Sequence, residues 1–464
     1  MNSDSGFFGA IDTLPRHPPP RWRAIARILA LCLIAGNTLT VRQAITGNGP
    51  EFRLGYLFSG ALIIWVWWVG KAEWRTIKRR PSLDRFLLLL IALFSLSTIS
   101  GIAVLGPSGL SATFYQAVSV ICLYSVAFIT LRRLYSAEEI LVLYVKVVKW
   151  AVVAAGVQIL FWILFKRDST EWLRTIGLTS RFGGEEGFFV RVTAWWQEPA
   201  QFAAFLSLGL LLAALPLPSS LAKKLNLGIG WRGAMVATFA LTFSTSAMPV
   251  VIFIFLVYSI DRHRKLALII LCVVVVVWVL SSGMIGSRLL ALRDLSANQG
   301  ETNLSVWALS SNLMASYKSL GAAPFGLGVG NHSVAYAEWL KGVSLEGFSR
   351  DQFYLNARDA GSMLIRLLTE FGFPSVLIWI YLISRSVRLA VQGRIRFVSS
   401  LFIEFIGISA FLTMCLRQGS YSLFDPWFFL LVFIQARTVK QTEVVVSSTV
   451  SRSLRRRPGT LPQR

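Results

Sequence analysis

The sequence predicts an all-α polytopic membrane protein with about 12 transmembrane helices, cytoplasmic termini, and one large and one medium outer loop. Of its 464 residues, 55% are hydrophobic and only 15% are charged, whereas a soluble chain has about a quarter of its residues charged. Apolar runs of span length also recur along the whole chain. The first run follows a polar, proline-rich N-terminus without the pattern of a cleavable signal peptide, so we expect it to be a retained span.

The apolar runs divide the chain into a cytoplasmic N-terminal segment (1–23), a transmembrane domain (24–435) and a basic cytoplasmic tail (436–464). Outer loops are expected at about 166–194 and 284–360. The predicted spans are 24–41, 55–70, 86–105, 114–130, 141–165, 195–217, 231–244, 247–260, 266–283, 361–384, 397–416 and 422–435.

The large outer loop is expected to hold an amphipathic helix near 303–320 and to pack as a lid over the bundle, because loops of this length are usually functional. The apolar side chains expected on this helix are Trp307, Leu313, Met314 and Tyr317.

The formal net charge of +23 is explained by the positive-inside rule. With a cytoplasmic N-terminus, about 29 of the 46 Lys and Arg residues face the cytoplasm and about 14 face outward. The others, Lys146, Lys149 and Arg366, lie within apparent spans. Nucleic acid is therefore not an expected partner, and the basic residues that remain outside become the informative ones.

Cysteine and histidine usage predicts neither disulfides nor a metal site. All four cysteines fall inside apolar runs, where they are typical of small core residues. Of the three histidines, only His332 is predicted to lie on the outer side, so a histidine metal cluster is not expected.

Arginines at the outer mouths of the predicted spans are candidate anion-binding groups, because a guanidinium group pairs with two phosphate oxygens at once. They are Arg191, Arg350, Arg358, Arg366 and Arg417. The alternative is ion pairing along the chain, of Arg366 with Glu370 at i,i+4 spacing and of Arg191 with Glu185 or Glu186.

Two outer carboxylates, Glu198 and Asp359, are candidates for a base or an acceptor contact. Each also has a structural alternative. Glu198 with Pro199 is typical of a helix start, and Asp359 could cap the helix that follows it.

Two further stretches have competing interpretations. Residues 244–249 (STSAMP) form a polar break between two short apolar runs, which indicates either backbone buried in protein at membrane depth or an ordinary surface hairpin. The GLGVG stretch at 326–330 lacks the spacing and the strand–helix context of a dinucleotide site, and we reject that interpretation.

The order of these features resembles the bacterial O-antigen polymerase and ligase family (Wzy-type) over roughly residues 180–435. The resemblance rests on an arginine before a Glu-Pro span start, a Ser/Thr turn, a P-x-G-x-G-x-G element, a helix ending in Glu-x-Gly, and a final span pair with Arg and Tyr. Their matches here are RVTAWWQEPAQFAAFL, LTFSTSAMP, PFGLGVGN, LIRLLTEFGF and LRQGSYSLFDPWFFLLVF.

The resemblance implies a glycosyltransferase of the bacterial inner membrane whose active site faces the periplasm. Its donor would be a glycan on undecaprenyl pyrophosphate, its acceptor a sugar hydroxyl, and it would need no cofactor. Membrane lipid is an expected partner, and a polysaccharide chain-length regulator is a candidate one. Arg191, Glu198 and Asp359 would be catalytic, whereas the residues binding pyrophosphate or substrate would be Gln197, His332, Arg350, Arg358, Arg366, Arg417 and Tyr421.

This chain departs from the family pattern at two places. Many relatives carry an arginine after the Ser/Thr turn, where this chain has Ala247-Met248. The ligase branch places a histidine before the Glu-x-Gly helix, where this chain reads ARDAGSMLIR. The missing histidine favours the polymerase over the first alternative, an O-antigen ligase acting on lipid A–core. The second alternative, a transporter or flippase for lipid-linked sugars, is less favoured because the sequence has no half-to-half repeat and few carboxylates at mid-membrane depth.

Overall fold

The computed structural model describes most of the predicted membrane domain. The described residues are 21–36, 40–41, 52–69, 81–106, 110, 113–114, 116, 118, 130–132, 134–166, 185–186, 189–196, 198–242, 244, 248–259, 304–339, 354, 356–357, 360–392, 395, 397–420 and 423–437. The predicted span 266–283, most of 114–130 and much of both outer loops lie outside these residues.

The described chain is almost entirely helical, as the sequence predicts. Its helices are α1 (Arg21–Gly36), α2 (Leu54–Val69), α4 (Pro81–Leu105), α7 (Ala137–Phe165), α9 (Pro199–Ala214), α10 (Ser219–Leu225), α11 (Ile229–Leu241), α12 (Met248–Ser259), α15 (Leu304–Ala322), α16 (His332–Trp339), α18 (Met363–Phe371), α19 (Phe373–Val391) and α20 (Ser399–Arg417), with a further helical stretch at 424–437. Two-residue antiparallel pairs join β1 (Thr40–Val41) to β2 (Phe52–Arg53) and β3 (Glu185–Glu186) to β4 (Phe189–Val190).

Three helices of the described chain are long and apolar enough to cross a membrane, namely α7, α19 and most of α20. The others are shorter or less apolar. Helices α11 and α12, with 13 and 12 residues, extend only about 20 Å at 1.5 Å per residue, against a hydrocarbon core of about 30 Å. The number of spans therefore remains a prediction.

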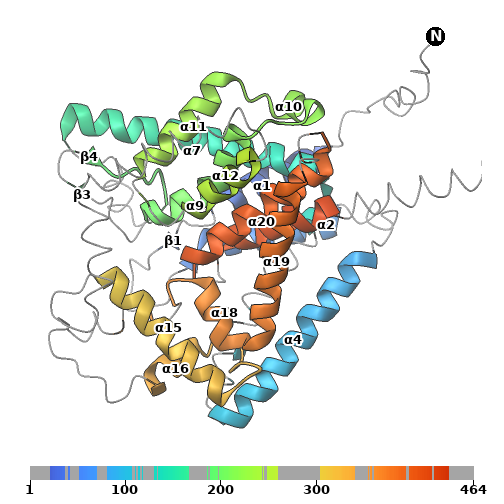
Figure 1. Ribbon diagram of the computed structural model, residues 1–464. Coiled ribbons are helices and arrows are strands. Elements are labelled where there is room, and N and C mark those ends of the chain that lie inside the picture. The colour runs from blue at the N-terminus through green and yellow to red at the C-terminus, as the bar shows by residue number, and fades with distance from the viewer. Residues whose placement is uncertain are drawn as a thin grey trace, which may run out of the picture.

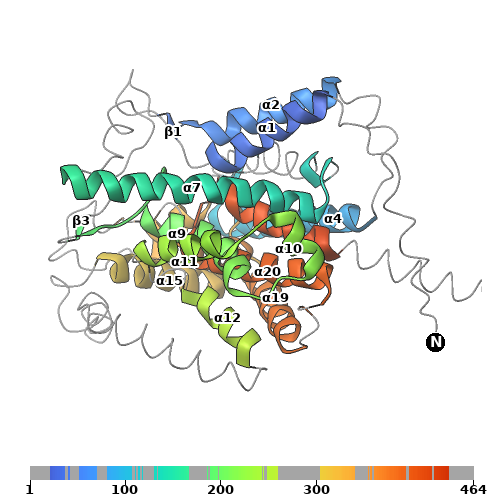
Figure 2. The same ribbon diagram turned by 90° about the horizontal axis from the view of Figure 1, so that it is seen from above.

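Helix α7 shows how the local sequence sets these elements. It begins with a capping box, in which the backbone N–H of Glu139 donates to Ser136 Oγ and the N–H of Ser136 donates to the Glu139 carboxylate. The long apolar run follows, and the left-handed Lys166 ends the helix. Helices α1 and α2 run side by side next to α7 (Figure 2).

One continuous apolar core joins α1, α2, α7, α9, α12, α19, α20 and the 424–437 helix. Tyr144 of α7 lies at its centre, where its hydroxyl donates to the carbonyl of Phe205 (2.6 Å) and accepts from the N–H of Gly209 (2.9 Å). Outside this core, large apolar side chains remain exposed along α2, α4, α7 and α19. Such a surface is typical of helices that face lipid.

Contacts between distant segments bring the predicted cytoplasmic stretches together. Lys224 of α10 pairs with Glu138 at the start of α7. The amide of Gln435 donates to the carbonyl of Arg132 (3.2 Å), so the end of the 424–437 helix lies beside the same region. These stretches therefore share one end of the bundle.

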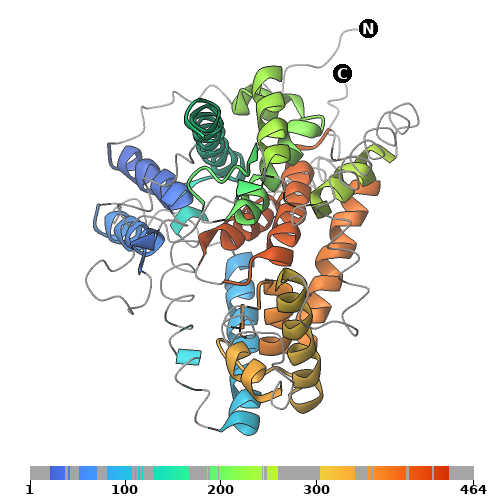
Figure 3. The same ribbon diagram turned by 90° about the vertical axis from the view of Figure 1, so that its left-hand side faces the viewer.

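The predicted outer segments meet at the other end of α7. The indole of Trp195 donates to the carbonyl of Ala35 at the end of α1 (2.7 Å). Gln158, two turns before the end of α7, contacts the segment before α9. Helices α15, α16 and α18 lie together at the foot of α4 and α19 (Figures 1 and 3).

Two expectations about this outer group are wrong in detail. The predicted span 361–384 is two helices, because Gly372 ends α18 with φ +63° and α19 begins at the next residue. The predicted helix near 303–320 is present as α15, but only Trp307 of its expected apolar side packs inward; Leu313, Met314 and Tyr317 are exposed.

Candidate functional site

Arg191 lies just after β4 and is half-buried against the end of α11. Its Nε donates to the carbonyl of Thr242 (3.3 Å), and the N–H of the next residue, Val192, donates to the carbonyl of Leu241 (3.1 Å). The last carbonyls of a helix have no partner within the helix and carry partial negative charge, so they favour a guanidinium there. Thr242, the C-cap residue of α11, is fully buried.

The segment between Arg191 and α9 is held from within the bundle. The side-chain oxygen of Gln158, itself buried in α7, accepts the N–H groups of Thr193 (3.0 Å) and Ala194 (3.1 Å). Ala194 has φ +49°, a left-handed conformation that non-glycine residues rarely adopt. The paired amide contact offsets this strain and directs Trp196 into the core, where its ring stacks on Phe202.

Glu198 occupies the N-cap position of α9, and Pro199 follows in the first turn. This is the helix start that the sequence allows as an alternative. The Glu198 side chain makes no capping hydrogen bond and is only partly buried. Glu198 therefore stands at the N-terminal end of α9, where the helix dipole favours a negative charge.

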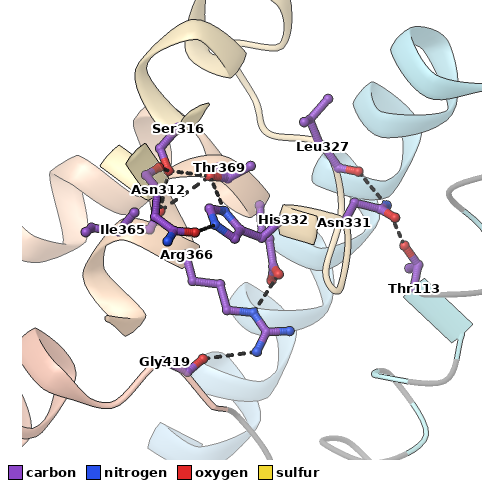
Figure 4. Close-up of polar contacts among 11 residues, drawn as sticks. Thr113, Asn312, Ser316, Leu327, Asn331, His332, Ile365, Arg366, Thr369 and Gly419 are labelled. Atoms are coloured by element: carbon purple, nitrogen blue, oxygen red, sulfur yellow. Dashed lines mark hydrogen bonds and ion pairs between the residues drawn. The ribbon is translucent and has the colours of Figure 1, made fainter. Parts of the chain in front are cut away.

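The P-x-G-x-G-x-G stretch packs against the end of α18 instead of binding a ligand through its backbone. The N–H groups of Leu327 and Gly328 donate to the carbonyls of Thr369 (3.0 Å) and Glu370 (3.1 Å). Asn331 then holds the turn, because its amide donates to Leu327 O (2.8 Å) and Thr113 Oγ1 (3.0 Å; Figure 4). The backbone donors that a dinucleotide loop would offer to phosphate are engaged here by a helix end.

Arg366 and Glu370 form a buried ion pair on α18. Arg366 Nε lies 2.7 Å from Glu370 Oε1, and a terminal guanidinium nitrogen donates to the carbonyl of Gly419 (3.0 Å; Figure 4). The side chains are 3% and 0% exposed. The i,i+4 pairing that the sequence offers as an alternative is therefore present, and it also ties α18 to the chain after α20.

A buried polar network lies next to this pair. His332 Nε2 is 2.7 Å from Asn312 Oδ1, and His332 Nδ1 is 2.8 Å from Thr369 Oγ1 (Figure 4). The hydroxyl of Thr369 is in turn 2.6 Å from that of Ser316. The network joins α15, α16 and α18, and every one of these side chains is almost completely buried.

The hydrogen-bond partners determine the tautomer of His332. The Asn312 amide nitrogen donates to the carbonyl of Ala308, so its oxygen faces the imidazole and must accept from Nε2–H. A neutral ring then accepts at Nδ1, from the hydroxyl of Thr369. Because that hydroxyl has one proton, it can only accept in its contact with Ser316, whose own proton is shared with the carbonyls of Asn312 (2.9 Å) and Ile365 (3.1 Å).

Burial and the neighbouring positive charge of Arg366 lower the pKa of His332 from 6.5 to about 3. The folded protein therefore takes up a proton at this group less readily than the unfolded chain does. The stability that the neutral ring contributes is complete above about pH 6.5 and is lost as the pH falls through the interval toward 3, by about 1.4 kcal/mol per pH unit.

We expect the outer helix group to lose stability between pH 7 and pH 5 by about 2 kcal/mol through His332. His332→Gln should be less stable at pH 7, because one ring contact is lost, but should lack this part of the acid dependence. Hydrogen exchange of α15, α16 and α18 in detergent at both pH values measures the effect. An equal acid loss in both proteins would contradict it.

The structure places the remaining candidate residues only in part. Arg417 ends α20, and its side chain lies outside the described residues, as do Gln197, Arg350, Arg358, Asp359 and Tyr421. Their predicted roles stay predictions. Sequence reasoning missed Gln158, Asn312, Ser316 and Thr369; a polar residue inside an apolar run was the available signal for Gln158.

The described residues thus include two arginine centres, Arg191 at the end of α11 and Arg366 on α18, both in segments predicted to face outward. Among the described residues, no group of three His, Cys, Asp or Glu side chains is arranged to hold a metal ion. Comparisons with protein-family models, with curated proteins and with solved structures found no match to this chain.

Proposed function

We propose that this protein is a polysaccharide polymerase that transfers a glycan chain from undecaprenyl pyrophosphate to a sugar hydroxyl of another lipid-linked repeat unit at the outer face of the inner membrane. The observation that carries the proposal is the pairing of distant motif segments. Arg191 donates to Thr242, which lies in the LTFSTSAMP segment. The glycine-rich loop caps α18, the Glu-x-Gly helix. Arg366 of α18 in turn donates to Gly419, which precedes the 424–437 helix.

The chemistry requires few protein groups. The bond between the sugar C1 and the pyrophosphate oxygen breaks, the acceptor oxygen forms the new glycosidic bond, and its proton passes to a base or to the solvent. The leaving group is already activated, so the protein must position the substrates and stabilise charge on the departing pyrophosphate. Membrane-bound substrates also suit a protein with an apolar helical exterior.

Arg191 is the described residue best suited to contact that pyrophosphate. It is half-buried, so its guanidinium group is oriented by Thr242 while part of it remains accessible. Glu198 would orient this arginine or contact the acceptor, and Asp359 is the candidate base. Arg366 would contact the pyrophosphate from a buried position, in which Glu370 already balances its charge.

Arg191→Ala is expected to lower the transfer rate by about 10²–10³, the usual effect of removing one group that stabilises developing charge. Arg191→Lys should recover only part of the rate, because lysine lacks the planar fork. The assay uses purified protein in liposomes with lipid-pyrophosphate-linked repeat units, and the glycan ladder is resolved on a gel.

A useful control is Lys223→Ala on α10, which changes a charge at the opposite end of the bundle and should leave the ladder unchanged. Full activity of Arg191→Ala would overturn the role of Arg191. If the unaltered protein forms no ladder with cognate repeats, transfer to added lipid A–core would indicate the ligase, and movement of the lipid-linked sugar alone would indicate a flippase.

A further inference from the structure

Helix α15 buries polar side chains and exposes apolar ones, the opposite of a helix in a water-exposed loop. Its buried face carries four polar residues beside the small Ala308 and Ala315, with Ser311, Asn312, Ser316 and Ser319 all less than 5% exposed. Its outward face is apolar, with Leu313 48%, Met314 50% and Tyr317 75% exposed. A helix at an aqueous surface normally buries its apolar face and exposes its polar one.

Three of these four polar side chains bond to neighbouring helices, and the fourth, Ser319, donates to the carbonyl of Ser316 in α15 itself. Asn312 receives the ring N–H of His332, Ser316 bonds to Thr369, and Ser311 accepts the hydroxyl of Tyr336 (3.0 Å). In a membrane, association of helices depends on such interhelical hydrogen bonds and on small residues, because apolar side chains gain nothing by leaving lipid. This arrangement is typical of a helix surrounded by lipid on its other side.

The outward face has a single charged residue, Lys318, over the 19 residues of α15. Its ammonium group does not project freely but donates to the carbonyl of Trp339 (3.3 Å). A long side chain that turns its charge back toward the protein or toward the headgroups is how lysine is accommodated at a membrane interface.

The apolar face of α15 also continues into the apolar exterior of a candidate membrane span. The N–H of Phe373, the first residue of α19, donates to the carbonyl of Pro324 (2.9 Å), which brings the exposed Phe325 and Phe373 to one junction. Leu377, one turn further along α19, is 68% exposed. Helix α18 packs against both α15 and α19 and so links the two helices (Figures 1 and 3).

We infer that Leu313, Met314, Tyr317 and Phe325 form a membrane-docking surface that lies in the acyl-chain region of the outer leaflet, continuous with the lipid-facing side of α19. Helix α15 therefore does not belong to a water-exposed lid. This inference depends on the apolar surface alone and not on the proposed transferase activity.

The test places single cysteines at Met314 and Tyr317 in a protein whose four native cysteines are replaced by alanine, reconstituted in phospholipid nanodiscs. Each cysteine carries an environment-sensitive fluorophore, which is quenched either by doxyl-labelled lipid or by aqueous iodide. Leu160→Cys on the exposed face of α7 serves as the lipid control, and Lys223→Cys on α10 as the aqueous control.

The inference predicts that labels at 314 and 317 are quenched by doxyl lipid as strongly as the label at 160, and are protected from iodide. Quenching by iodide alone, as at 223, would overturn it. Protection from both quenchers would also overturn it, because a second copy of the chain or another protein would then cover this face.

A second measurement keeps the native cysteines, in case their replacement prevents folding. A diazirine-bearing amino acid in place of Tyr317 should give lipid adducts by mass spectrometry after irradiation in nanodiscs. The same amino acid in place of Lys223 should give far fewer. Equal yields at the two positions would contradict the inference.

Discussion

Glu370→Ala is expected to destabilise the protein by about 3–5 kcal/mol, the cost of leaving one member of a buried ion pair without its partner. Arg366 is only 3% exposed and has Glu370 Oε1 at 2.7 Å, so water cannot replace the lost carboxylate. The loss would appear as a lower midpoint of thermal unfolding in detergent and as poor recovery of folded protein.

The double variant Arg366→Met with Glu370→Met separates folding from function. Replacing both members of a buried pair by apolar side chains of similar size is often close to neutral, so we expect the double variant to recover most of the stability that Glu370→Ala loses. A double variant as unstable as the single one would contradict this explanation of the pair.

The same variant decides between the two interpretations of Arg366. If it folds and forms the glycan ladder, Arg366 serves only to hold α18, and its predicted contact with pyrophosphate is wrong. If it folds but gives no ladder, the charge of Arg366 is required for transfer. The ion pair Arg385–Glu404 joins α19 to α20 through two contacts of 2.8 Å. Because it lies away from Arg191 and Arg366, replacing this pair by methionines is the matched control in the same assay.

The longest helices of the described chain could be predicted from the sequence because their apolar runs are long and continuous. The predicted span 141–165 corresponds to α7 at Ala137–Phe165, and the predicted span 397–416 corresponds to α20 at Ser399–Arg417. The break at Gly372 had a signal that the prediction passed over. Glycine followed shortly by proline, in FGFPS, is typical of one helix ending and the next beginning.

The candidate site was less accessible to prediction. The pair of Arg366 and Glu370 could be predicted because four residues bring two side chains to one helix face. The contacts of Gln158 with Ala194, and of Asn312 with His332, depend on how loops return to the bundle, and no local pattern encodes this path. Nor could hydropathy tell which face of α15 points inward, because lipid and protein core attract the same apolar side chains.

Glycines at the junction of α18, α19 and the P-x-G-x-G-x-G loop lie where no side chain fits. A Cβ on Gly326, which has φ +91°, would come within 2.2 Å of Glu370 O and 2.5 Å of Phe371 N. A Cβ on Gly372 would come within 2.0 Å of Pro324 O. The close approach allows the loop N–H groups to cap α18, so these glycines are needed for packing and not for binding a nucleotide.

Gly326→Ala is therefore expected to destabilise the protein by about 3–5 kcal/mol, because a strained φ and an overpacked backbone contact add together. Gly321→Ala, five residues earlier, is the matched control. No atom lies within 4 Å of its added Cβ, and alanine in place of a helical glycine should stabilise by about 0.5–1 kcal/mol. Thermal unfolding in detergent measures both. Equal effects at the two positions would show that the loop does not clamp α18, and the buried ion pair on that helix would then need another explanation for its fixed position.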